Sequence, residues 1–268
     1  MSDGRRRARH PSLGARWVAA QRLGLERTRP STPGGDIDAE RRLYRSVAGS
    51  VSIPGGPSSA LARRTQVIDA EVAGALGRGT TQIVLLGAGD DGRALRFGGG
   101  AARWFEMDRP AAQADKRERL RALDVATPET TYLALDLSAD DLGPALHAAG
   151  HQASAPSLFV AEGLFDTLTL EVTASVCTEL RARAAPGSVL VATFSVAPEA
   201  GELTRALRAA TGLVRRGPRN EFRPGDPRKL MVVTGWRVTH AESSTGRHLD
   251  PGAHTLILVC EPDPARGG

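Results

Sequence analysis

The stretch IVLLGAGDDGR, residues 83–93, joins an apolar run to a loop that contains three glycines. A short apolar run that ends at a glycine is typical of a strand buried on both faces. The spacing of Gly87, Gly89 and Gly92 matches the fingerprint with which Rossmann-like folds hold a nucleotide at the start of a helix. This stretch therefore predicts a strand, a ligand-binding loop and a helix, in that order.

Apolar runs alternate with amphipathic segments along the chain, which is the pattern of a parallel sheet covered by helices on both faces. The expected strands are Gln82 to Leu86, Ala102 to Met107, Thr131 to Leu135, Ser157 to Ala161, Ser188 to Phe194, Trp236 to Ala241 and His254 to Cys260. The expected helices are Leu13 to Leu25, Leu61 to Leu76, Pro110 to Leu123, Asp140 to Ala149 and Leu168 to Ala184. The sequence thus predicts an α/β fold with a Rossmann-like, seven-stranded, mostly parallel sheet.

The start of the 268-residue chain differs in composition from the rest. It is rich in arginine, proline, glycine and serine, a composition that buries little apolar surface. We expect residues 1–35 to form a basic, largely disordered segment with one short helix, followed by a single domain at 36–268. A solvated segment is favoured over a nucleic-acid arm, because aromatic residues make up only 4% of the chain and are not interleaved with these arginines.

The chain has no apolar stretch of about 20 residues, the length that spans a bilayer, and no apolar segment follows its arginine-rich start as in a signal peptide. We therefore expect a cytoplasmic protein without membrane or nucleic-acid partners. The two cysteines, Cys177 and Cys260, stand in apolar contexts without partners at metal-ligand spacing. We expect both in the core and predict no metal site.

Two acidic residues, Asp90 and Asp91, occupy the glycine loop where a dinucleotide would place its pyrophosphate. Two carboxylates there would repel phosphate but suit a ligand that carries positive charge. S-adenosylmethionine is such a ligand, because it has a sulfonium and an ammonium group and no phosphate. The alternative is that one of the two residues caps the following helix, and both roles are compatible.

Acidic residues also follow the next three strands. Glu106 and Asp108 project to one face at the end of the second strand, where either can accept both hydroxyls of a ribose. Asp136 and Leu137 follow the third strand and are placed to read an adenine edge, with an ordinary strand-end turn as the alternative. Glu162 follows the fourth strand at the carboxyl edge of the sheet, where it either binds a cationic ligand group or is exposed to solvent.

Together these segments resemble the leucine carboxyl methyltransferase family, including its bacterial branch of small-molecule O-methyltransferases. The resemblance spans roughly residues 12 to 260 and implies the class I methyltransferase fold. It rests on five ordered motifs, namely Arg64-Thr65-Gln66-Val67-Ile68-Asp69, Leu86-Gly87-Ala88-Gly89 with Asp91 and Arg93, Phe105-Glu106-Met107-Asp108 with Pro110 and Lys116, Asp136-Leu137, and Glu162-Gly163.

The resemblance implies that S-adenosyl-L-methionine is the cofactor and where its parts bind. Arg64 would hold the carboxylate, with Arg63 as its alternative, and Gly87 would lie against the backbone of the methyl donor. Asp108 would bind the ribose, Asp136 and Leu137 the adenine, and Glu162 the methionine end. The expected cofactor-binding residues are Arg64, Gly87, Ala88, Gly89, Asp91, Glu106, Asp108, Asp136, Leu137 and Glu162.

The implied reaction is transfer of the sulfonium methyl group to an oxygen, a carboxylate or a hydroxyl, of a small molecule such as a secondary metabolite. A carboxylate acceptor needs alignment rather than a base, whereas a hydroxyl acceptor must lose a proton. His147, His151, Asp166 and His240 are possible bases by chemistry. No catalytic residue is assigned.

Two departures from the family pattern leave other functions open. Asp90 stands where the family usually has an aromatic residue, and Thr167-Leu168 stands where it commonly has Tyr-Leu. These departures motivate an alternative, a cofactor-binding scaffold that has lost methyl transfer or that catalyses a non-methylating reaction such as cyclisation. A third hypothesis, that the protein is an NAD-dependent oxidoreductase, is supported by the glycine spacing alone, and the acidic residues of the loop disfavour it.

Overall fold

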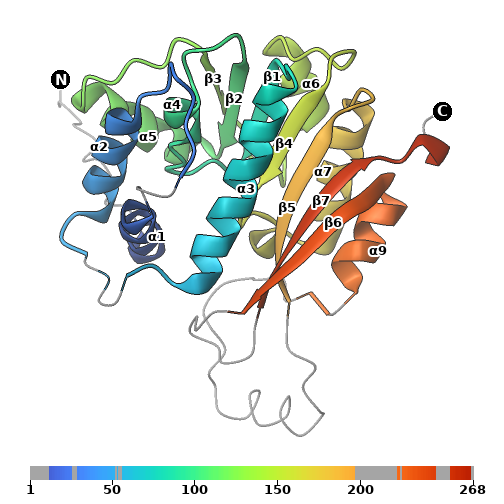
Figure 1. Ribbon diagram of the computed structural model, residues 1–268. Coiled ribbons are helices and arrows are strands. Elements are labelled where there is room, and N and C mark those ends of the chain that lie inside the picture. The colour runs from blue at the N-terminus through green and yellow to red at the C-terminus, as the bar shows by residue number, and fades with distance from the viewer. Residues whose placement is uncertain are drawn as a thin grey trace, which may run out of the picture.

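The computed structural model describes residues 12–25, 29–51, 53, 56–196, 222–223, 225–245 and 254–266. They contain a seven-stranded sheet with the strand order β3-β2-β1-β4-β5-β7-β6 (Figure 1). The strands are β1 (Gln82–Leu86), β2 (Arg103–Asp108), β3 (Thr130–Ala134), β4 (Ser157–Ala161), β5 (Val189–Val196), β6 (Trp236–Thr245) and β7 (His254–Pro262). Strands β1 to β5 are parallel, and β7 runs antiparallel to β5 and β6. The expected α/β fold with a mostly parallel, seven-stranded sheet is confirmed.

Helices cover both faces of this sheet. Figure 1 shows α3 across the near face, with α7 and α9 behind the strands. The near side carries α1 (Leu13–Gly24), α2 (Ile37–Ala48), α3 (Ser59–Gly77), α4 (Arg93–Arg96) and α5 (Pro110–Ala122). The far side carries α6 (Leu142–Ala148), α7 (Leu170–Ala182) and α9 (Asp226–Val233). Two short 3₁₀ helices are η2 (Phe165–Thr167) and η3 (Pro264–Arg266).

Strand β1 is buried on both faces because helices lie on either side of it. Val84 and Leu86 pack into the core formed with α6, α7 and α9, whereas Ile83 and Leu85 pack with Ile68 of α3. This alternation follows from the two-residue period of a strand. It fixes β1 in the middle of the sheet, so the loop after it opens at the centre of the carboxyl edge.

The five expected helices form, with ends that shift by one or two residues. The described residues contain three further helices, α2, α4 and α9, that were not among the expected ones. Helix α2 begins where the side chain of Asp36 accepts the backbone N–H of Ala39 at 2.7 Å, and it buries Leu43 and Tyr44. Its buried residues Leu43, Tyr44, Val47 and Ala48 recur at helical spacing, so this helix could have been found from the sequence. Helix α4 has only four residues, too short for a periodic pattern.

The described part of the N-terminal segment, residues 12–25 and 29–35, packs on the domain. Its expected helix forms as α1, within Leu13 to Leu25. Arg22 and Arg29, however, are buried, so the expectation of a solvated segment is wrong for these two residues. Acidic side chains of the domain surround them, which a sequence pattern does not reveal. Residues 1–11 and most of the region Arg215 to Arg228 lie outside the described residues, and the division at residue 35 stays a prediction.

No helix in the described ranges is both long and apolar enough to cross a bilayer. Cys177 and Cys260 are unpaired and buried in the core, as expected. Across the same ranges, no three histidine, cysteine or carboxylate side chains gather in a way that could hold a metal ion.

Candidate functional site

The ends of three parallel strands meet at one edge of the sheet. Leu86, the last residue of β1, lies beside Met107 of β2 and beside Ala161, the last residue of β4. Parallel strands in this register leave the sheet at the same level. The residues that follow are three of the predicted cofactor contacts, namely Gly87, Asp108 and Glu162.

The three glycines of the loop have different structural roles. Gly87 and Gly89 have positive φ angles of 61° and 48°, a conformation that side chains rarely adopt. A Cβ on Gly87 would also lie 2.9 Å from Leu164. A Cβ on Gly92 would collide with Glu40 of α2. The third glycine therefore makes room for α2 rather than for a ligand.

Hydrogen bonds tie the glycine loop to the end of β2. The backbone N–H of Ala88 donates to the carbonyl oxygen of Met107 at 3.0 Å, and that of Gly89 donates to Asp108 Oδ2 at 2.7 Å. Asp108 Oδ1 accepts the N–H of Arg109, also at 2.7 Å. The half-buried Asp108 carboxylate is thus fixed beside the loop, and each of its oxygens keeps a further lone pair for a ligand.

Glu106, the alternative to Asp108, points into the protein. Its side chain is 1% exposed and accepts a hydrogen bond from Lys116 Nζ at 2.5 Å. Burial raises the pKa of the Glu106 carboxyl group, although Lys116 opposes that shift. The strand end therefore presents Asp108, and the cofactor contact predicted for Glu106 has no support from this geometry.

Asp136 and Leu137 lie half-buried in the turn after β3. Asp136 Oδ1 accepts the N–H of Ser138 at 3.0 Å, and the N–H of Asp136 donates to Asp140 Oδ2 at 2.8 Å. These bonds are those of an ordinary strand-end turn, the alternative reading of the sequence. The turn lies at the correct edge, and the adenine contact stays a prediction.

Glu162 is buried rather than exposed, with 8% of its side chain accessible. Its Oε2 atom lies 2.9 Å from Arg22 Nη2 and 2.6 Å from Arg93 Nη1, and its Oε1 atom lies 2.8 Å from Arg64 Nε. Burial alone would raise the pKa of this carboxyl group, but the three arginines hold that pKa well below its usual range. Glu162 is therefore an anion at neutral pH.

The neighbouring arginines of α3 point in different directions. Arg64 is 19% exposed and faces Glu162. Arg63 is 52% exposed and pairs with Glu242 of β6 on the surface. Of the two residues that the sequence offers for a ligand carboxylate, only Arg64 lies at the candidate site.

The three arginines around Glu162 belong to a larger buried ion network. Asp69 of α3 links Arg93 to Arg29, with distances of 2.7 Å to Arg93 Nε and 2.7 Å to Arg29 Nε. Arg29 and Arg96 in turn contact Glu40 of α2. The network has five arginines, Arg22, Arg29, Arg64, Arg93 and Arg96, and four carboxylates, Glu40, Asp69, Asp91 and Glu162. Among the described residues it thus carries one positive charge in excess.

The two acids of the glycine loop are occupied by arginines, contrary to our expectation that they face a ligand. Asp91 is buried, lies 2.5 Å from Arg93 Nη1 and accepts the N–H of Arg93 at 2.8 Å. Asp91 thus closes a turn onto the first residue of α4, but the N-cap position of this helix is Gly92 and no side chain caps it, so the capping alternative is not borne out. Asp90 pairs with Arg119 of α5 at 2.9 Å. Since both charges are compensated, the loop acids do not by themselves exclude a phosphate, and a cofactor contact by Asp91 stays a prediction.

Hydrogen-bonding capacity is left over around Glu162. Arg22 Nε, Arg93 Nη2 and the hydroxyl of Thr65 are buried without a hydrogen-bond partner in the described part of the chain. Buried donors are normally satisfied, and an unmade bond is costly. The excess positive charge and these donors both fit a ligand that brings a carboxylate.

Only one of the four possible bases lies at the carboxyl edge. Asp166 of η2 accepts the N–H and the hydroxyl of Ser195, both at 2.7 Å. His147 and His240 are exposed, the former at the end of α6 and the latter on β6. His151 is buried at the opposite edge, before β4, and burial lowers its pKa to about 4.

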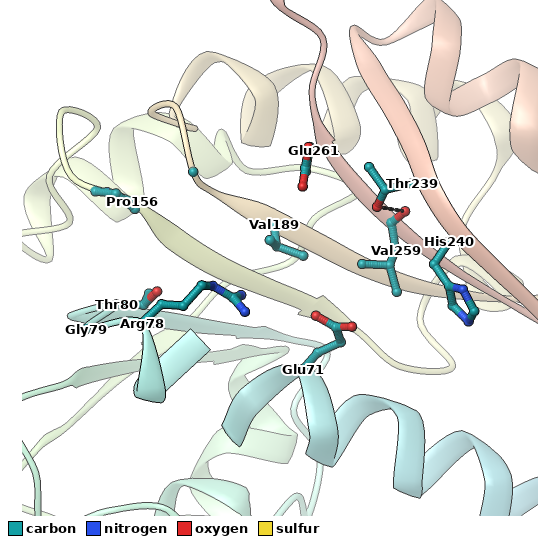
Figure 2. Close-up of a pocket in the computed structure, with 11 residues that line it drawn as sticks. Glu71, Arg78, Gly79, Thr80, Pro156, Val189, Thr239, His240, Val259 and Glu261 are labelled. Atoms are coloured by element: carbon teal, nitrogen blue, oxygen red, sulfur yellow. Dashed lines mark hydrogen bonds between the residues drawn. The ribbon is translucent and has the colours of Figure 1, made fainter. Parts of the chain in front are cut away.

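A separate groove of about 540 Å³ opens beside α3 at the amino ends of β4 and β5. Figure 2 shows Arg78 and Glu71 on the α3 side, with Val189 and Val259 of the sheet between them and Glu261. The groove contains none of the predicted cofactor residues. It lies at the amino edge of the sheet, whereas open α/β folds bind ligands at the carboxyl edge.

The sequence interpretation missed the contribution of Arg22 and Arg29. Both stand in an arginine-rich segment, where nothing in the sequence distinguishes them from a neighbour such as Arg16, which is only half-buried. Arg22 contacts a residue 140 positions away, and Arg29 contacts one 40 positions away. Arg93 and Asp69 were part of quoted motifs, but no role followed from spacing alone.

Comparison with known proteins gives a consistent result. The family model for leucine carboxyl methyltransferase matches residues 35–181. A protein of Mycobacterium avium (strain 104) is 31% identical over 241 residues, which cover 81% of this chain and 75% of that protein. A protein of Streptomyces coelicolor is 35% identical over 212 residues, 78% of this chain and 70% of that protein. The names of both proteins assign them to the S-adenosyl-L-methionine-dependent methyltransferases.

Solved structures show a similar fold. The magnesium protoporphyrin IX methyltransferase of Synechocystis PCC 6803, crystallised with bound S-adenosylhomocysteine, superposes with a TM-score of 0.54. The alignment covers 83% of this chain and 92% of that one at 15% sequence identity. Similarity at this level concerns the fold, and it supports the class I methyltransferase architecture expected from the sequence.

Proposed function

This chain belongs to the leucine carboxyl methyltransferase family, and on that premise we propose that it is a small-molecule O-methyltransferase that uses S-adenosyl-L-methionine. The acceptor is a carboxylate or hydroxyl oxygen, most simply on a secondary metabolite. The relatives named as S-adenosyl-L-methionine-dependent methyltransferases are about one-third identical to this chain, and they support S-adenosyl-L-methionine as its cofactor. The names of those relatives do not state which atom is methylated, so the oxygen acceptor is an additional part of the proposal.

The observation that carries this proposal is the position of Arg64 beside Glu162, 2.8 Å apart at the carboxyl edge. A methionine group ends in a carboxylate and an ammonium on one carbon. Arg64 would bind the carboxylate through its fork of N–H donors, and Glu162 would bind the ammonium. The buried N–H groups Arg22 Nε and Arg93 Nη2, which have no hydrogen-bond partner among the described residues, support this assignment, because a ligand carboxylate can accept such bonds.

The adenosine half of the cofactor fits the next strand ends. Asp108 has lone pairs available for the two hydroxyls of a ribose. Gly87 and Gly89 keep the loop free of side chains, so that a ligand can approach the backbone. Asp136 and Leu137 would contact the adenine from the turn after β3.

When bound, the cofactor supplies an electrophilic methyl group on a sulfonium. The residues of this chain would hold the donor and align the acceptor oxygen with that methyl group, and such alignment can account for a large part of a rate enhancement. A carboxylate acceptor requires nothing more. A hydroxyl acceptor must lose a proton, and Asp166 is the candidate base at the carboxyl edge. The carboxylate of Asp166 accepts two hydrogen bonds from Ser195, which hold it in place.

Binding measurements on the full chain test the proposal. In a thermal-shift and calorimetric comparison, S-adenosylhomocysteine should raise the melting temperature and bind with one site per chain, whereas NAD should do neither. Stabilisation by NAD without stabilisation by S-adenosylhomocysteine would refute the methyltransferase assignment. Methyl transfer itself is measured with radiolabelled S-adenosyl-L-methionine and a panel of carboxylic acids and phenols.

A further inference from the structure

The side chain of Arg22 extends from helix α1 to the candidate site, where it contacts Glu162. Resting on the proposed function, we propose that Arg22 is a positioning residue that fixes the carboxylate of Glu162 for the ammonium group of the cofactor. Helix α1 then forms part of the cofactor site, although it precedes the glycine loop by about sixty residues.

The guanidinium of Arg22 is held on several sides. Its Nη2 atom lies 2.9 Å from Glu162 Oε2, and its Nη1 atom lies 3.7 Å from Asp91 Oδ2. Nη1 also donates to the hydroxyl of Tyr44 at 3.2 Å, and the guanidinium carbon lies 5.6 Å from the centre of the Tyr44 ring. With 7% of its side chain exposed, Arg22 has little freedom to move away from Glu162.

Tyr44 connects this arrangement to the glycine loop. Its hydroxyl accepts the hydrogen bond from Arg22 and also one from the backbone N–H of Gly92 at 3.0 Å. The position of Arg22 is therefore set by the same loop that approaches the cofactor. This geometry places Glu162 at a fixed distance from the loop.

Glu162 depends on Arg22 more when the cofactor is bound. Arg64 faces Oε1 of Glu162, but in the proposed complex Arg64 binds the carboxylate of the ligand. Arg22 and Arg93 then remain as the two groups that hold Oε2. Arg93 also binds Asp69 and Asp91, so it cannot follow Glu162 if that side chain turns. Without Arg22, the ammonium-binding carboxylate loses one of its two fixed donors.

The experiment compares two ligands that differ in whether they carry the amino-acid group. S-adenosylhomocysteine has the ammonium and the carboxylate, and 5′-methylthioadenosine lacks both while keeping the adenosine and the thioether. In Arg22→Ala we expect the affinity for S-adenosylhomocysteine to fall about ten- to a hundredfold, the usual effect of a lost charge-assisted bond. The affinity for methylthioadenosine should change less than about twofold. Arg22→Lys should recover part of the loss.

Arg16→Ala is the matched control. Arg16 lies on the same helix and donates from Nε to the carbonyl oxygen of Ala48 of α2 at 3.3 Å, so it also ties α1 to the domain. The ion pairs of Glu162 are with Arg22, Arg64 and Arg93 and do not involve Arg16. Its removal should leave both affinities unchanged, which separates loss of helix docking from loss of positioning.

Several outcomes would overturn the inference. If Arg22→Ala keeps a native circular dichroism spectrum and wild-type affinity for S-adenosylhomocysteine, Arg22 does not position Glu162. Equal losses for both ligands would show a structural role only. In a Glu162→Gln background the effect of Arg22→Ala should shrink, and an undiminished effect would contradict a role through Glu162.

Two further results complete the design. If Arg22→Ala does not fold, Tyr44→Phe is the substitute, because it removes one hydrogen-bond partner of Arg22 and keeps the ring. This variant should bind S-adenosylhomocysteine more weakly and methylthioadenosine with unchanged affinity. Equal weakening of the binding of both ligands would refute the inference. Failure of the wild-type chain to bind S-adenosylhomocysteine would instead refute the proposed function itself.

Discussion

The two faces of the sheet are built from different chemistry. The face under α6, α7 and α9 is an apolar core that includes Phe159, Phe194 and Trp236. The face under α1 to α4 combines a smaller apolar core with the nine charged side chains of the buried ion network. Buried apolar contacts stabilise a fold without regard to direction, whereas buried ion pairs are stabilising only when every partner is in place. The apolar face supports the sheet, and in the proposed function the charged face would recognise the ligand that binds at the carboxyl edge.

Asp69→Asn should have the largest effect on stability, because it removes a negative charge from the interior of the buried ion network. Asp69 holds both Arg93 and Arg29, and the substitution leaves two buried cations short of a partner. We expect a loss of about 3–5 kcal/mol in the free energy of unfolding, measured by urea denaturation. Asp38→Asn is the control, because Asp38 pairs with Arg41 on the surface of α2. A loss below about 1 kcal/mol would show that the network contributes little to stability.

Leu180→Ala tests the apolar face in the same way. Leu180 is fully buried in the core formed with α7, and deleting its side chain leaves a cavity. The free energy of unfolding should fall by about 3 kcal/mol. Unlike Asp69→Asn, this variant should bind S-adenosylhomocysteine with unchanged affinity below its melting temperature. A large loss of affinity in folded Leu180→Ala would show that the two faces are not separate in function.

Arg64→Ala should change binding more than stability. The loss of a charge-assisted contact to the ligand carboxylate is expected to cost about 1.5–3 kcal/mol of affinity for S-adenosylhomocysteine, measured by calorimetry. Arg64→Lys should recover part of it, because an ammonium cannot reproduce the fork of a guanidinium. Arg63→Ala is the neighbouring control, since Arg63 pairs with Glu242 at the surface and should affect neither property. Wild-type affinity in Arg64→Ala would move the carboxylate contact to another arginine of the network.

His151 gives the apolar face a dependence on pH. It packs between Phe105 and Phe159, and burial lowers its pKa from 6.5 to about 4. Between these values the unfolded chain binds more protons than the folded chain, so stability should decrease as the pH falls from about 6.5 to about 4. The expected loss is on the order of 1 kcal/mol. Chemical denaturation at several pH values should show a smaller slope in His151→Gln, and an identical slope would contradict this role.

The strands and the convergence of their ends could be predicted because both depend on local patterns. Strands β1 and β4 match the sequence prediction at both ends, since each is a continuous apolar run followed by a glycine or an acid. Parallel pairing then brings Gly87, Asp108 and Glu162 to one edge, whatever the details of packing. These features needed no knowledge of distant contacts.

The directions of charged side chains could not be predicted. Asp91 and Asp108 both stand near the glycine loop, yet one is buried against Arg93 and the other faces the edge. Arg22 and Arg16 lie on one helix, and only Arg22 reaches Glu162. Such choices depend on partners from remote segments, and a single sequence gives no measure of those contacts.

The buried ion network has five arginines and four carboxylates among the described residues, so the carboxylates are shared and the positive charge is not fully balanced within the network. Arg64, the least buried member, is where the network meets the solvent. Ionic strength and the identity of the buffer anion should therefore alter the melting temperature before any cofactor is added. In a sulfate buffer and a chloride buffer of equal ionic strength, the protein without cofactor should therefore have different melting temperatures, and a binding measurement begins from a different stability in each.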